Sequence, residues 1–307
     1  GQGVFFGLGG YCMGMYLKLE AAGPGQVPDF MSWSGVERLP LFWRPFRHAW
    51  FALPMAVILP VLVAWGVGSL VFRQRVRGAY FAILSQALAA AFVILLIGQQ
   101  GLTGGTNGLT NVTQLFGYDL ADPANQRLLY FVAVACLGIS YLGARHLVRS
   151  RIGKLLVAVR DGEDRVRYLG YDPAKVKTVA FAASAAIAGL AGALFVPIVG
   201  IMSPALLGIV PSIEMIIWVA VGGRATLFGA ALGAIAVNWA KTGLSERFPS
   251  GWLYLQGLLF VVVVTFAPDG LVGLRRLPSL VGEGLRRRRN APSTTLAEHA
   301  GIEMEAA

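Results

Sequence analysis

Few polar side chains in this sequence stand where they could act on a substrate. The long uncharged stretches contain only a handful of strongly polar residues, namely Ser85, Gln86, Glu214, Asn238 and Gln256. An amide or carboxylate inside an apolar helix is expensive in a bilayer and tends to face a cavity or a partner. We therefore take Gln86, Glu214 and Asn238 as candidates for a polar pathway through a membrane. For Glu214, a place near the outer interface or a structural bond to the backbone is the alternative.

A glycine-rich loop at 101–110 is a second candidate for contact with a substrate. It contains four glycines, several hydroxyl side chains and Asn107. Such a permissive backbone can approach a ligand closely or line a vestibule. The other interpretation is a flexible turn between two helices.

The sequence contains none of the patterns that define a catalytic or metal site. There is no GxSxG elbow, no HExxH motif and no pair of carboxylates within an apolar stretch. The three histidines and two cysteines have no ligand spacing. Gly153-Lys154 lacks the upstream glycine and the following Ser or Thr of a nucleotide-binding P-loop. We predict that the chain is not an enzyme, holds no metal and binds no cofactor.

Composition and charge favour a membrane protein. Charged residues make up 14% of the chain and apolar residues 56%, whereas a soluble domain has roughly 25% charged residues. The net charge is +10, but the basic residues cluster in alternate loops at 73–77, 145–177 and 275–289. This is the positive-inside pattern of a multi-pass membrane protein. It argues against a basic surface patch for nucleic acid, and we expect no nucleic-acid partner.

The apolar segments predict an all-α, polytopic fold with about eight spans, since a bilayer core needs about 20 helical residues. The predicted spans are 1–17, 50–72, 78–98, 128–144, 178–200, two segments within 206–240, and 248–268. The two segments within 206–240 turn near Gly223, and the first is short, so a re-entrant hairpin is the alternative. We expect a membrane domain at 1–282 and a disordered basic and polar tail at 283–307. Because the chain starts inside an apolar run, we expect it to be N-terminally incomplete.

Small residues recur at four-residue spacing in these segments, and such spacing lets helix backbones approach closely in lipid. The pairs are Gly3/Gly7, Gly10/Gly14, Ala185/Gly189, Ala188/Gly192 and Gly229/Gly233. Pro54 and Pro60 lie within one predicted span, which we expect them to kink.

The loop at 145–177 holds nine of the chain's 26 Lys and Arg residues. Residues 150–160 predict an amphipathic helix, with Ile152, Leu155, Leu156 and Val159 on one face. Residues 161–171 predict a short charged helix that Gly170 ends. A solvated linker is the plainer interpretation, but a projecting helix with an apolar side and mixed charges is typical of a docking element.

Several runs of residues resemble a known family. DRVRYLG at 164–170 resembles the coupling loop of ABC importer permeases, although Asp-Arg-Val stands where that motif has Glu-Ala-Ala. The runs that resemble branched-chain amino acid ABC permeases are GQGVFFGLGGY (1–11), TGGTNGL (103–109), VAVRD (157–161), LAGAL (190–194) and WVAVGGR (218–224). Gln2 in place of the usual His, GMY at 14–16 and NWAKT at 238–242 are similar to the second permease subunit of the urea-transporting branch.

The resemblance implies an ATP-driven importer in the bacterial cytoplasmic (inner) membrane. The distribution of basic loops places both ends of this chain, the C-terminus included, in the cytoplasm. Its partners would be a second permease forming a heterodimer, two cytoplasmic ATPase subunits that bind the ATP, and an extracytoplasmic substrate-binding protein. The residues expected to couple to the ATPases are Arg160, Asp161, Glu163, Asp164, Arg165 and Gly170. The residues expected along the substrate pathway are Gln86, Asn107, Glu214 and Asn238.

Three substrates or mechanisms stay open at this point. Urea import is the first expectation. A branched-chain amino acid importer of the same architecture is the main alternative. A passive solute channel is the third, and it would need no coupling loop.

Overall fold

A computed structural model describes residues 1–76, 78–245, 251–266 and 270 of the chain. It divides into two compact units, Gly1–Glu214 and Met215–Ala307, which are described separately below. Helices dominate both units. The described strands are two short ones, β1 (Gln114–Leu115) and β2 (Tyr118–Asp119), which form a small hairpin. The prediction of an all-α, polytopic fold is confirmed. The predicted tail at 283–307 lies outside the described residues.

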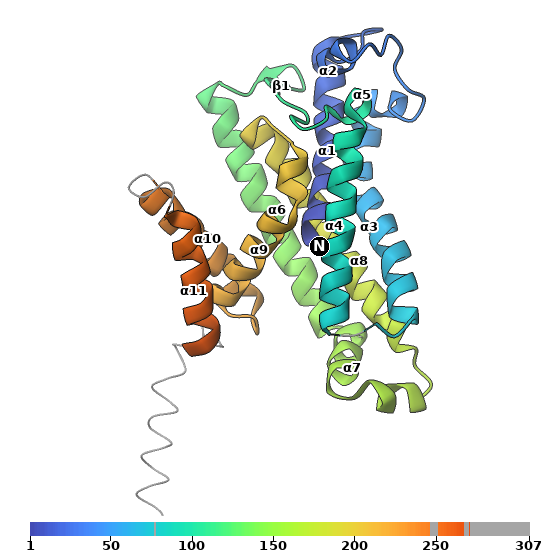
Figure 1. The fold of residues 1–307 in the computed structure, drawn as a ribbon, viewed down its shortest axis with the longest axis vertical. Coiled ribbons are helices and arrows are strands. Elements are labelled where there is room, and N and C mark those ends of the chain that lie inside the picture. Colours follow the sequence, from blue (N-terminus) through green and yellow to red (C-terminus); the bar gives the residue numbers. More distant parts are fainter. Residues whose placement is uncertain (77, 246–250, 267–269, 271–307) are drawn as a thin grey trace, which may run out of the picture. The chain divides into compact units, whose positions relative to one another are not determined.

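Three helices form the core of the first unit: α1 (Gln2–Ala22), α3 (Ala49–Arg73) and α8 (Pro173–Val199) (Figure 1). Glycines allow their backbones to touch. A Cβ atom on Gly9 would overlap the backbone of Gly189 in α8, and one on Gly192 would overlap the carbonyl of Phe6 in α1. The close packing predicted from small residues is therefore confirmed, with Gly9 as an additional member. Around this contact the apolar side chains are almost fully enclosed, as Phe5 and Met15 show.

The contact between α3 and α8 involves one of the two prolines predicted to kink this segment. Helix α3 continues as one helix through both Pro54 and Pro60. Pro60 has no N–H group, so the carbonyl of Ala56, one turn earlier, loses its helical donor. That carbonyl oxygen faces Gly189, where an added Cβ would lie 2.5 Å from it. Pro60 itself is buried against the same glycine. Gly189 thus leaves room for both the Pro60 ring and the Ala56 carbonyl, which has no helical donor.

Two further long helices complete the first unit: α4 (Ala79–Gly98) and α6 (Pro123–Arg149). In the described part of the chain, five helices are long and apolar enough to cross a membrane, namely α3, α4, α6, α8 and residues 227–244. The predicted number of about eight spans is not confirmed. Helix α9 (Ile209–Gly222) has only 14 residues, which corresponds to about 21 Å of helix, short of the roughly 30 Å bilayer core.

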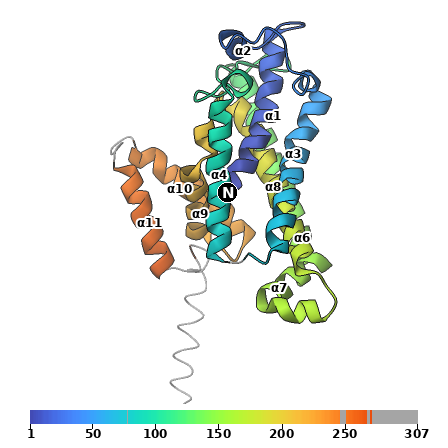
Figure 2. The ribbon, with the colours of Figure 1, turned by 45° about the vertical axis from the view of Figure 1, so that its right-hand side comes forward.

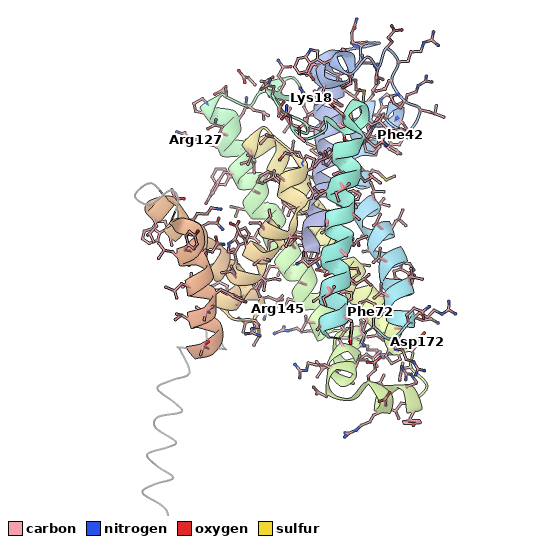
Figure 3. All side chains as sticks on the ribbon, viewed as in Figure 1. Lys18, Phe42, Phe72, Arg127, Arg145 and Asp172 are labelled. Atoms are coloured by element: carbon pink, nitrogen blue, oxygen red, sulfur yellow. The ribbon has the colours of Figure 1, made fainter. Side chains whose placement is uncertain are left out.

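The loops of the first unit gather at its two ends (Figures 1 and 2). One end holds α2 (Asp29–Trp33), the 3₁₀ helix η1 (Arg44–Arg47), α5 (Gln100–Thr103) and the β-hairpin. The other holds the turn after α3 and helix α7 (Arg151–Tyr168). Figure 3 places Lys18 and Arg127 toward the first end, and Phe72 and Asp172 toward the second. The basic loops predicted to share one side therefore do lie at one end, as far as the structure describes them.

The glycine-rich loop at 101–110 is held in place by its neighbours. Leu109 exchanges two backbone hydrogen bonds with Met202, each 2.8 Å long, and it is fully buried. Met202 lies just before the 3₁₀ helix η2 (Pro204–Leu207). The hydroxyl of Thr103 donates to the carbonyls of Leu96 and Gln99. The loop is therefore packed against residues 200–203, and the flexible-turn interpretation is not supported.

The second unit contains the end of α9, then α10 (Leu227–Ser245) and α11 (Trp252–Phe266). Helices α9 and α10 cross at glycines, because a Cβ on Gly222 would overlap the carbonyl of Gly229, and one on Gly233 that of Trp218. The turn between them falls at 223–226, as predicted. Ile217, Val221 and Val237 form a small buried cluster packed against Leu259 and its neighbours in α11.

Substituting Gly192 by Val should destabilise the first unit, because the new side chain has no room against the carbonyl of Phe6. Overpacking of this kind costs about 1–3 kcal/mol or more. Gly138→Val in α6 is the matched control, since nothing lies within 4 Å of a Cβ there. Thermal unfolding in detergent should show a lower midpoint for Gly192→Val alone. Equal midpoints for the two variants would contradict the described contact.

Candidate functional site

The chain turns sharply between α6 and α7, and this turn sets the direction of α7, which carries most of the charged residues of the loop at 145–177. Ser150 separates the two helices, and its hydroxyl donates to the Leu147 carbonyl at 2.6 Å. The N–H of Gly153 is directed to the same Ser150 oxygen at 3.4 Å, which caps α7. A Cβ on Gly153 would overlap the carbonyl of Val148. Glycine at 153 therefore allows α7 to start directly against the end of α6.

Helix α7 consists of two short helical parts separated at Gly162. That residue has φ −173° and ψ 84°, an extended conformation inside an otherwise helical segment. Each part buries one valine, Val159 before the break and Val166 after it. The two helices predicted from 150–160 and 161–171 are thereby confirmed.

Part of the apolar face of α7 is turned toward the chain itself. Leu156 and Val159 line a hollow of about 430 Å³ opposite Phe72 and Phe81, which belong to α3 and α4. The hollow is also lined by Val76, Gly78, Arg160, Glu163 and Lys177. Part of the face predicted as a docking surface thus looks onto a hollow that α7 shares with α3 and α4.

Glu163 fastens the second part of α7 to the start of α8. Its carboxylate accepts a hydrogen bond from Lys177 Nζ at 2.7 Å and lies 3.7 Å from Arg167. The Glu163 side chain is only 14% exposed, so this ion pair is better shielded from water than a surface pair. Nearby, Asp172 caps α8 by accepting the N–H of Ala174 at 3.0 Å. Together these bonds fix the return of the chain into the bundle.

The tip of the segment after α7 is shaped by Gly170. This residue has φ +86°, a left-handed conformation that favours glycine. Its N–H donates to the Arg167 carbonyl at 3.0 Å, and the Tyr171 N–H to the Val166 carbonyl at 3.3 Å. This is the Schellman pattern that ends a helix. It leaves two large side chains in solvent, Tyr168 at 91% and Leu169 at 76% exposure.

The predicted coupling residues divide into an outward set and one inward residue. Arg160 and Asp161 are exposed and paired at 2.9 Å. Asp164 is exposed and lies 3.3 Å from Arg167, while Arg165 and Gly170 are also exposed. Glu163 alone of the six is turned inward. The exposed set, beside an apolar tip, can bind a partner by charge and by burial of Tyr168 and Leu169, and it contains no arrangement for catalysis.

Sequence reasoning did not identify two features of this site. One is the apolar tip at 168–171, although large apolar residues inside a charged loop were a usable signal. The other is Lys177 as the partner of Glu163, because a separation of 14 residues gives no local pattern.

The predicted pathway residues lie on three helices and one loop, three of them in the first unit and Asn238 in the second. Gln86 lies in α4 with its Oε1 atom shielded from solvent. Asn107 is exposed in the glycine-rich loop at the other end of the first unit. Glu214 is half-buried in α9. Asn238, in the second unit, donates to the Ala234 carbonyl of its own helix at 2.8 Å. The amide of Asn238 is therefore bonded to the backbone of its own helix, and its predicted place along a substrate pathway stays a prediction.

The chain belongs to the family described as branched-chain amino acid transport system / permease component, whose model matches residues 1–264. It is 29% identical over 249 residues to the high-affinity branched-chain amino acid transport system permease protein LivM of Escherichia coli K12, covering 74% of this chain and 58% of that protein. A probable branched-chain amino acid transport permease protein LivM of Methanocaldococcus jannaschii is 23% identical over 72% of this chain and 68% of its own length.

Another relative is named for a different substrate. The autoinducer 2 import system permease protein LsrC of Yersinia enterocolitica is 25% identical over 81% of this chain and 68% of its own length. No solved structure matches the chain. These relatives are transport permeases and not enzymes. The chain spans about 58% of the length of the E. coli relative.

Replacing Lys177 by Met should loosen the second part of α7. The change removes the partner of a shielded carboxylate, which we expect to destabilise this segment by roughly 1–2 kcal/mol. Lys175→Met is the matched control, because Lys175 is exposed and lies two residues away on the same helix. Hydrogen exchange at residues 163–169 should quicken in Lys177→Met only. Unchanged exchange in both variants would show that the Glu163–Lys177 ion pair does not hold the second part of α7 to α8.

Proposed function

We propose that this chain is a membrane-spanning permease subunit of an ATP-driven importer in the bacterial cytoplasmic membrane. The observation that carries the proposal is α7, a fixed, kinked and charged projection at the end of the first unit where the basic loops gather. By the positive-inside rule this end faces the cytoplasm, and we place the C-terminus on the same side.

The proposed partners are those that the family resemblance implies, and two surfaces of the first unit are compatible with them. Two cytoplasmic ATPase subunits supply ATP hydrolysis, and one of them contacts the exposed charges and apolar tip of α7. Helix α6 buries very little of itself within the chain, so lipid and a second permease subunit are available to cover it. An extracytoplasmic binding protein delivers the substrate to the opposite end.

The mechanism proceeds by alternating access. ATP binding closes the ATPase pair and moves the tip of α7, and the Glu163–Lys177 pair passes that movement to α8. Arg160, Asp161, Asp164 and Arg165 act in this scheme as contact residues, whereas Glu163 holds α7 in position.

Urea is the substrate that we propose first. It is supported by the resemblance of Gln2 and of residues 238–242 to the urea-transporting branch. Branched-chain amino acids are the second candidate, supported by the names of the LivM relatives. A passive channel needs no segment that couples to an ATPase, so it would not account for α7, and we do not favour it.

The decisive measurement is ATP-dependent uptake of labelled urea and labelled leucine into proteoliposomes. These would contain the full-length permease pair, the ATPases and the binding protein. Wild type should take up urea only with ATP. Asp164→Ala combined with Arg165→Ala should abolish most of this uptake, because exposed contacts to the ATPase are lost while the complex still assembles.

Lys175→Ala, which removes an exposed charge in the first turn of α8 outside the predicted contact residues, serves as the control and should leave uptake unchanged. Uptake of urea without ATP would support a channel instead. Leucine uptake without urea uptake would assign the chain to the amino acid branch.

A further inference from the structure

A hollow of the first unit lies where two membrane-spanning helices end. It is the space of about 430 Å³ that α7 shares with α3 and α4, which we call the α7 hollow. Phe72 is the last residue but one of α3, and Phe81 is the third residue of α4. Both helices are long and apolar enough to cross a bilayer. Figure 3 shows Phe72 at this end of the unit. The α7 hollow therefore lies at the edge of the hydrocarbon core.

The walls of the α7 hollow are mainly apolar. Phe72 and Phe81 line it with aromatic rings whose centroids are 5.3 Å apart. Leu156 and Val159 line it from α7. Exposing such surface to water is unfavourable, so an apolar group that covers it is stabilised there. The volume of the hollow falls within the roughly 300–1,000 Å³ typical of small-molecule sites.

The charged side chains that line the α7 hollow are paired with carboxylates. Lys177 donates to Glu163 at 2.7 Å, and Arg160 donates to Asp161 at 2.9 Å. These two pairs add little net charge. A preference for a charged ligand must therefore come from the residues beside the hollow.

Positive charge is in excess beside the hollow. Arg73 and Arg75 lie in and after the last turn of α3, next to residues that line it, and both are exposed. Within the described ranges, neither arginine has an acidic partner. The first part of α7, residues 151–160, adds Arg151 and Lys154 and contains no acidic residue. The segments around the hollow therefore favour an anion.

The two parts of α7 differ in composition. Its acidic residues all fall within 161–164, whereas the first part combines basic side chains with apolar ones. Ile152 and Val157 in this first part are 36% and 48% exposed. Basic and apolar side chains on one short helix are typical of a helix at a membrane surface. The exposed tip at Tyr168 belongs to the second part, so contact with an ATPase there leaves the first part to the membrane.

We propose that the α7 hollow binds an anionic phospholipid of the cytoplasmic leaflet. Its phosphate lies at Arg73 and Arg75, because a guanidinium group matches the geometry of phosphate oxygens. The upper parts of its acyl chains cover Phe72, Phe81 and Leu156. Basic pockets between membrane helices on the cytoplasmic side are known to bind such head groups.

A lipid in this place braces the first part of α7 against the ends of α3 and α4. Lipid composition then regulates how firmly α7 is held. The inference rests on the membrane placement in the proposed function, and it does not depend on which solute is transported.

Binding is tested by native mass spectrometry of the purified full-length permease pair. The added lipids are dioleoyl phosphatidylglycerol, which is anionic, and dioleoyl phosphatidylcholine, which is not. Arg73→Gln and Arg75→Gln should each weaken phosphatidylglycerol binding about fivefold, the effect of one basic residue near an anionic surface. Lys175→Gln removes an exposed charge from the same end of the unit outside the hollow, and it should leave binding unchanged.

Hydrogen exchange in lipid nanodiscs shows where the lipid binds. Residues 151–160 of wild type should exchange more slowly with phosphatidylglycerol than with phosphatidylcholine. Val76→Trp fills the hollow without changing a charge and should remove this difference. Val157→Trp is the matched control, because it adds the same ring to α7 at an exposed position that does not line the hollow. The two arginine variants decide the matter if Val76→Trp fails to fold.

Three results would overturn the inference. The first is equal exchange of residues 151–160 in the two lipids for wild type. The second is a loss of binding in Lys175→Gln as large as in Arg75→Gln, which would show a diffuse effect of charge. The third is release of phosphatidylglycerol from the permease pair when the ATPases bind, which would assign the hollow to the ATPases.

These results are separate from the outcome of the uptake measurement. Normal ATP-dependent uptake without a lipid preference would overturn the lipid site and leave the importer in place. A wild-type complex that transports neither urea nor leucine but shows the lipid-dependent exchange would overturn the proposed function and support the lipid site.

Discussion

The structure of the first unit depends on the direct backbone contact between α1 and α8. At Gly9 against Gly189, and at Gly192 against the Phe6 carbonyl, the two backbones touch with no side chain between them. In lipid there is little hydrophobic force to bring helices together, so association relies on close van der Waals packing. This contact fixes where Gln2 lies relative to Ser184, whose hydroxyl accepts a hydrogen bond from the Gln2 amide at 3.1 Å. It also gives α8 a firm base from which its charged N-terminal part reaches α7.

Most of the helices could be predicted from the sequence because long apolar runs permit little else in a bilayer. The turn near Gly223, the two parts of α7 and the end at Gly170 also followed from local signals. The number of spans did not, since α1, α9 and the described part of α11 do not meet the length and apolarity that the other five helices meet. Hydropathy registers composition within a window, whereas spanning also requires a helix that continues without interruption.

The site and its surroundings were harder to predict because their bonds join distant positions. Gln2 and Ser184 are 182 residues apart, and no local pattern indicates that they meet. Asn238 was predicted along a pathway, and the structure adds that its amide donates to the Ala234 carbonyl of its own helix. Glu163 was predicted to couple to a partner, and the structure adds that Lys177 donates to its carboxylate; both roles stay predictions. In each case the residue type indicated which bonds the side chain can make. The direction in which the side chain points, and so its actual partner, depended on tertiary packing.

Helix α8 connects the two ends of the first unit in a single piece. Lys177 is its fifth residue, and the residues that follow its last turn form the bridge between Met202 and Leu109. With 27 residues it is about 40 Å long. Such a rod acts as a lever: a tilt of about 5° would displace one end by about 3.5 Å relative to the other over that length. A sideways push at the α7 end, about a pivot within the helix, would therefore move the end beside the glycine-rich loop in the opposite direction.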